Sequence, residues 1–167
     1  MVDHLSREQT EAWLDDKVVQ GIESETTDGA EFNLQLQLQL SRLPLHVIKE
    51  ETWDPLRVVG ECTFDTERVA ALVEDDEDRQ ELLVRLSPVL ATVPGFYTFL
   101  DEDGDPCEFP DVHSILLEHR IYPDGATQQS VMESVMGTAT AMRSIQNTAA
   151  ALQNQSIQDT NAEETEQ

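Results

Sequence analysis

The sequence predicts an α+β fold in which an antiparallel sheet is flanked by helices and a long helix closes the chain. Three observations support this prediction. Polar and apolar residues alternate strictly over residues 31–40, which is typical of a strand with one buried face. Further strand patterns follow across short turns, as in an antiparallel meander. Apolar residues then recur at helical spacing over residues 127–153.

The first predicted helix begins at Ser6, whose spacing to Gln9 matches a capping box. We expect this helix to run to about Gln20, because apolar residues recur at every fourth position and Trp13 lies beside them. The recurring residues are Leu14, Val18 and Ile22. The polar segment 24–29 then ends the helix.

Three strands are predicted next, at residues 32–40, 45–50 and 56–64. The first strand directs Phe32 and four leucines inward, and its outer face carries uncharged glutamine. The third strand contains Gly60, which predicts either a bulge or a close approach of another segment.

The second half of the chain is predicted to hold helices, two strands and a final helix. A helix is expected to begin at Asp65 or Thr66, and leucines at helical spacing continue as far as Pro88, which bends or ends the segment. The acidic run 74–78 either breaks this helix or begins another. Strands are expected at residues 96–100 and 112–122, and turn signals follow each of them.

The last predicted helix spans residues 127–153 and is about 40 Å long at 1.5 Å per residue. Because this length exceeds what a small sheet needs, we expect the second half of its apolar seam to contact a partner or a second copy of the chain. The expected partner-binding residues are Met142, Ile145, Ala149 and Leu152. The domain is predicted to cover residues 1–153, and residues 154–167 are predicted to be a disordered acidic tail.

The charge of the chain is strongly negative. Asp and Glu number 34 against 10 Lys and Arg, which gives a formal charge of -24. Such a chain repels itself unless salt screens the charges, so the composition indicates a salt-rich cytoplasm such as that of extremely halophilic archaea. The alternative is an acidic protein that binds a basic partner or imitates nucleic acid. The acids are spread along the chain, which favours the first account, and no basic stripe exists to bind nucleic acid.

The sequence predicts no targeting segment, no membrane span and no cofactor. The start of the chain lacks an apolar signal region, and no apolar run approaches the ~20 residues that a span needs. Cys62 and Cys107 follow no metal spacing, and Cys62 is expected to be a small buried strand residue. We therefore expect a cytoplasmic protein.

No catalytic or metal-binding motif is present. The acidic segment 101–105 fails the EF-hand pattern. An EF-hand loop requires glycine at its sixth position and glutamate at its twelfth, and counting from Asp101 these positions hold Pro106 and Val112. The histidines have no zinc spacing, and nucleophile elbows and phosphate loops are absent. We therefore predict a non-enzymatic protein. The alternative is a small enzyme whose site is assembled from scattered residues such as Asp111, His113 and His119.

The predicted element order resembles the type III secretion chaperone-like fold. That order is a helix, a three-strand meander, helices, two strands and a helix. The junction from Arg120 to Gly125 supports the resemblance, which covers about residues 6–150 and extends to small archaeal proteins of unknown function that share the architecture. The resemblance implies a non-enzymatic dimer that holds segments of client proteins, so we expect a protein-binding or chaperone-like function.

Overall fold

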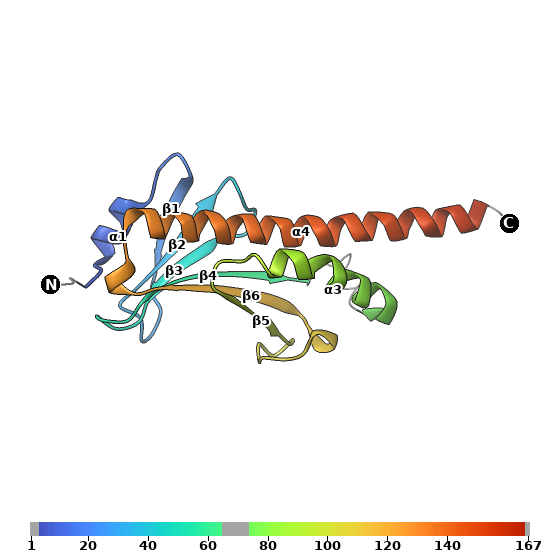
Figure 1. Cartoon of the computed structure of the whole chain (residues 1–167), viewed down its shortest axis with the longest axis horizontal. Coiled ribbons are helices and arrows are strands. Elements are labelled where there is room, and N and C mark those ends of the chain that lie inside the picture. Colours follow the sequence, from blue (N-terminus) through green and yellow to red (C-terminus); the bar gives the residue numbers. More distant parts are fainter. Residues whose placement is uncertain (1–3, 65–73, 166–167) are drawn as a thin grey trace.

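The computed structural model describes residues 4–64 and 74–165, and in these residues six strands form one antiparallel sheet (Figure 1). The strand order is β1-β2-β3-β4-β6-β5. This arrangement confirms the predicted α+β class and its long C-terminal helix. The elements are α1 (Arg7–Trp13), β1 (Val19–Glu25), β2 (Phe32–Leu38), β3 (Leu45–Lys49), β4 (Leu56–Thr63), α3 (Asp76–Leu90), β5 (Phe96–Leu100), β6 (Ser114–Ile121) and α4 (Gln128–Thr165), with short 3-10 turns at Phe109–Asp111 and Pro123–Gly125.

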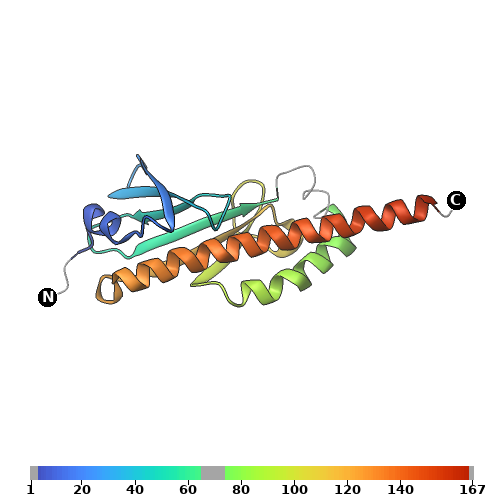
Figure 2. The ribbon, with the colours of Figure 1, turned by 90° about the horizontal axis from the view of Figure 1, so that it is seen from above.

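Helix α4 lies along one face of the sheet and passes over β4 and β6, while α3 runs beside it (Figures 1 and 2). The apolar faces of the strands and of α4 meet in one core, to which β2 contributes Leu34 and Leu36 and α4 contributes Val131 and Val135. Burial of these side chains supplies most of the stability of the fold, at about 25 cal/mol per Å² of apolar area.

Gly60 lies where Met142 of α4 packs tightly against the sheet. A Cβ atom at this position would overlap the sulfur of Met142 and would lie 2.9 Å from Cδ2 of Leu45. The pairing of β4 with β6 continues without a shift through Gly60 and Leu117. Of the two predicted reasons for this glycine, the structure therefore shows the close approach.

The first predicted helix is too long. Helix α1 begins as expected, because the Ser6 hydroxyl accepts a hydrogen bond from the Gln9 backbone, but it ends at Trp13. The residues expected to complete the helix lead into β1, where Ile22 pairs with Leu36 of β2. Pairing with an existing strand outweighs the weak helical preference of Val and Ile here.

Most of the remaining predictions agree with the structure. Strands β2, β3 and β4 form the expected meander, and β5 has the expected bounds. The acidic run begins a helix, because the Asp75 carboxylate caps α3 by accepting from the backbone of Glu77 and Asp78. Pro88 lies within the last turn of α3. The helix expected to begin at Asp65 or Thr66 lies outside the described residues.

The structure corrects the predicted disordered tail as far as Thr165, because α4 continues to that residue, and residues 166–167 lie outside the described ones. Extending a helix that is already packed needs no new nucleation, so a polar segment can remain helical. Arg85 of α3 supports the start of the extension by donating a hydrogen bond to Oε1 of Gln155, at 3.3 Å. Among the described helices, none is long and apolar enough to cross a membrane.

Candidate partner-binding surface

The four residues predicted to contact a partner lie in the protein's own core. The exposed fractions of Met142, Ile145, Ala149 and Leu152 are 0%, 1%, 3% and 1%. The structure therefore corrects the expectation that these four side chains are exposed to a partner.

Helix α3 is the reason for this correction. It packs along α4, and its Leu82, Leu86 and Leu90 are buried in the same core. The prediction from the sequence compared the length of α4 with the sheet alone. It therefore treated the second half of the apolar seam as uncovered. Because α3 extends the covered area, the α4 side chains whose burial the structure describes have little apolar surface left to offer.

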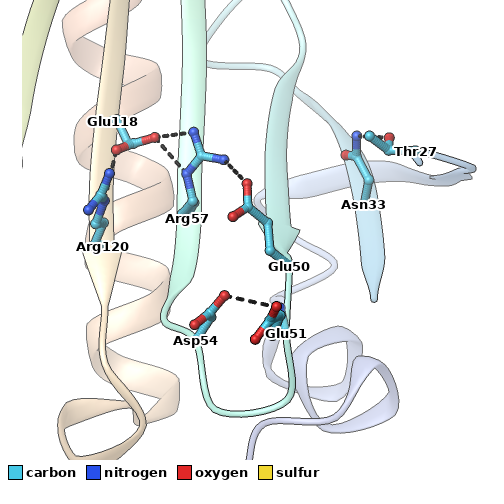
Figure 3. Close-up of polar contacts among 8 residues, drawn as sticks. All are labelled: Thr27, Asn33, Glu50, Glu51, Asp54, Arg57, Glu118 and Arg120. Carbon is cyan, nitrogen blue, oxygen red and sulfur yellow. Dashed lines mark hydrogen bonds and ion pairs between the residues drawn. The ribbon is translucent and has the colours of Figure 1, made fainter. Parts of the chain in front are cut away.

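The face of the sheet away from α4 carries a network of charged side chains centred on Glu118 (Figure 3). Glu118 lies on β6 and is only 3% exposed. Its Oε1 accepts from Nε of Arg57 on β4 at 2.6 Å and also from Nη2, and its Oε2 accepts from Nε of Arg120 at 2.9 Å. Arg57 also donates to Glu50 at 2.9 Å. Two cations, through three N–H donors, thus compensate the buried carboxylate of Glu118.

This network fixes Arg120 against an aromatic side chain of the neighbouring strand. The Arg120 guanidinium lies 5.6 Å from the ring centroid of Phe96 on β5, within the range of a cation–π contact. The hydrogen bond and charge of Glu118, followed by a weaker contribution from Tyr122, raise the pKa of Arg120. Arg120 is therefore held beside Phe96, and both Phe96 and Tyr122 are exposed.

Strand β5 forms one edge of the sheet and is uncharged and aromatic. Phe96 and Tyr97 are 45% and 41% exposed. The segment after β5 covers the far end of the strand, because the Cys107 N–H donates to the Phe99 carbonyl at 2.9 Å. No segment among the described residues pairs with the outer edge at Tyr97.

The opposite edge, β1, differs in chemistry. Its exposed side chains include Glu23 and Glu25, and charges on an edge strand discourage pairing with another chain. We call Phe96, Tyr97, Arg120 and Tyr122 the β5 surface. Aromatic residues and arginine are the types enriched at the energetic centres of protein interfaces.

The scattered residues of the alternative enzyme are not brought together. His113 and His119 lie six residues apart along one strand direction, which separates them by about 20 Å. Nδ1 of His119 is hydrogen-bonded to the Ser134 hydroxyl of α4 at 2.7 Å, and Asp111 is exposed on a short turn. In the described ranges no three His, Cys, Asp or Glu residues are grouped as metal ligands.

The cysteines are free, and Cys62 is buried as the sequence predicted. Burial, with a smaller contribution from the charge of Glu61, raises the pKa of Cys62 to about 12. The Cys62 thiol is therefore protonated at neutral pH and is a poor nucleophile.

The sequence resembled small archaeal proteins of unknown function, and comparison with known proteins finds relatives described as uncharacterized. Residues 6–148 match the model of a family described as an uncharacterized conserved protein, DUF2299. The chain belongs to this family. A crystal structure of an uncharacterized protein from Methanothermobacter thermautotrophicus is similar to the fold of this DUF2299 chain, with a TM-score of 0.66 at 16% identity. The similarity covers 90% of this chain and 99% of that one. No curated protein matches.

Sequence reasoning missed the β5 surface, although one signal was present. In a chain with ten basic residues, Arg120 and Tyr122 stand together at the end of a strand. The junction from Arg120 to Gly125 was used to support the fold resemblance, and its side chains were not considered as a binding surface. Phe96 joins it only through the pairing of β5 with β6, in which Phe96 is opposite Glu118.

Proposed function

We propose that this DUF2299 protein is a non-enzymatic, chaperone-like protein that binds an extended segment of another protein along the β5 surface. The observation that carries the proposal is the neutral aromatic edge strand in a chain whose formal charge is -24. An extended peptide beside β5 would gain backbone hydrogen bonds from the edge and side-chain contacts from Phe96 and Tyr97.

The positioning of Arg120 supports this proposal. Arg120 is already held by Glu118, so its side chain loses little conformational freedom when a partner binds. The entropic cost of binding is therefore smaller. The resemblance of the element order to type III secretion chaperones is consistent with binding of client segments and is part of the same proposal. A second copy of the chain is the other possible occupant, and the experiment below distinguishes the two.

A photo-crosslinking amino acid at position 97 is expected to capture a partner protein from the native cytoplasm in about 2 M KCl. The matched control carries the same amino acid in place of Ile22, which is 39% exposed on the opposite edge strand. We expect one recurrent adduct at position 97 and none at position 22. An adduct of twice the chain mass would identify a second copy as the occupant, and equal labelling at both edges would contradict the proposal.

We also propose that the protein works in a salt-rich cytoplasm, as its charge suggests. Thermal unfolding followed by circular dichroism should show a rise in melting temperature of at least about 10 °C between 0.1 M and 3 M KCl. Salt shortens the Debye length from about 10 Å at 0.1 M to about 3 Å at 1 M, which removes repulsion among the carboxylates. A melting temperature that stays constant across this range would refute the proposal.

A further inference from the structure

A pocket of about 480 Å³ lies beside α4, where the ends of β2 and β4 meet the helix. Its size falls within the range of small-molecule binding sites. It lies on the α4 side of the sheet, opposite the network around Glu118, so the inference drawn from it does not depend on the proposed function. The residues that line it come from three segments: Gln39, Leu40 and Arg42; Cys62, Thr63 and Phe64; and Arg143, Ile145, Gln146, Asn147, Ala149 and Ala150.

The lining is divided into an apolar floor and a polar rim. The floor consists of buried side chains, among them Phe64, Ile145 and Ala149. The exposed rim carries Arg42 and Arg143 together with side-chain amides. No Asp or Glu is among the described residues that line the pocket. The described lining residues therefore carry a formal charge of +2 in a strongly acidic molecule.

These two arginines, unlike most basic residues of the described part of the chain, form no ion pair with a described residue. Six of the nine Lys and Arg residues in the described part of the chain contact a carboxylate within 4.0 Å. The three that form no such pair with any described residue are Lys17, Arg42 and Arg143. Two of these three line the same pocket. In a chain with 34 acids, two cations at one site that contact no carboxylate of the described residues point to an external anion.

We propose that this pocket binds a small organic anion, with its carboxylate or phosphate group at Arg42 and Arg143 and its apolar part against Ile145 and Ala149. The guanidinium fork suits both oxyanions, because two parallel N–H groups can donate to two oxygens. The amides of Gln146 and Asn147 supply further donors and acceptors for orientation. The neutral Cys62 thiol at the floor fits a role in binding and not in nucleophilic attack.

The test uses 8-anilinonaphthalene-1-sulfonate, a fluorescent probe that combines an aromatic body with one oxyanion. Titration into the full chain in 1 M KCl is expected to show one saturable site. The double variant Arg42→Gln/Arg143→Gln should bind the probe at least about tenfold more weakly, because it lacks both charged donors. Ala150→Trp, at an exposed helical position on the rim, should weaken binding similarly by filling the pocket.

A matched control separates pocket chemistry from net charge. Arg7→Gln/Lys17→Gln removes the same two charges at exposed positions outside the pocket, and its affinity for the probe should stay within about twofold of the parent. Displacement of the probe by inorganic phosphate and by acetate, at constant ionic strength, then shows which oxyanion the arginines prefer. Melting curves of all variants verify that each protein is folded.

Three results would overturn the proposal. The first is the absence of saturable binding by the folded parent. The second is equal affinity in the parent and in Arg42→Gln/Arg143→Gln, which would place the probe on another apolar surface. The third is an equal loss in the control variant, which would attribute the effect to overall charge.

Discussion

Leu36→Asp is expected to leave the protein unfolded at 25 °C. Leu36 lies at the centre of β2, is fully buried, and pairs with Ile22 on one side and Leu45 on the other. A carboxylate at this position would have neither water nor a cation beside it, and such substitutions cost more than about 4 kcal/mol. Because small proteins are stable by only about 5–15 kcal/mol, this loss removes most of the folded population. Circular dichroism in about 2 M KCl would measure the result.

The neighbouring residue provides the control for this experiment. Gln37 lies on the same strand, points to the opposite face and is exposed. Gln37→Asp adds the same charge to the same strand, and we expect a change of no more than about 0.5 kcal/mol in the free energy of unfolding. If the two variants melted alike, the assignment of faces in β2 would be wrong.

Ile145→Asp is expected to have an effect of the same size, for a reason that the sequence did not reveal. From the sequence, Ile145 and Leu152 were expected to contact a partner or a second copy of the chain, and charges at such a contact would leave folded monomers. In the structure Ile145 is 1% exposed and belongs to the core. We therefore expect Ile145→Asp to unfold the protein, with loss of the cooperative melting transition and exposure of apolar surface.

Thr140→Asp is the control, because Thr140 lies on the exposed side of the same helix. It should melt within a few degrees of the parent. Light scattering on the parent and on Ile145→Asp distinguishes the two interpretations of this seam. A well-folded monomeric Ile145→Asp beside a dimeric parent would restore the sequence-based interpretation and contradict the packing described above.

The sheet was largely predictable because its strands have simple patterns. The alternation in residues 31–40 determines which face is buried, and Phe96–Leu100 is a short aromatic run bounded by proline and glycine on one side and by acids on the other. Strand β1 was not predictable in this way. Val18 and Ile22 recur at a spacing that suits a helix, but Val18 lies in a turn and pairing with β2 decides the conformation of Ile22.

The surfaces were less predictable because they depend on contacts between residues far apart in the chain. Arg57 and Glu118 are 61 positions apart, and their ion pair follows from the pairing of β4 with β6. Burial of Ile145 and Leu152 depends in the same way on where α3 packs. Periodicity in one segment indicates which side of an element is apolar, but it does not identify the segment that covers it.

Helix α4 has a further consequence for how the molecule moves. Its 38 residues span about 57 Å at 1.5 Å per residue, and its C-terminal end extends beyond α3 and the sheet (Figures 1 and 2). The molecule is therefore elongated, and its rotational diffusion should be anisotropic, with slow end-over-end tumbling and faster rotation about the helix axis. Because the N–H bonds of α4 lie nearly parallel to this long axis, their transverse ¹⁵N relaxation should be faster than that of the sheet amides, whose N–H bonds lie across it.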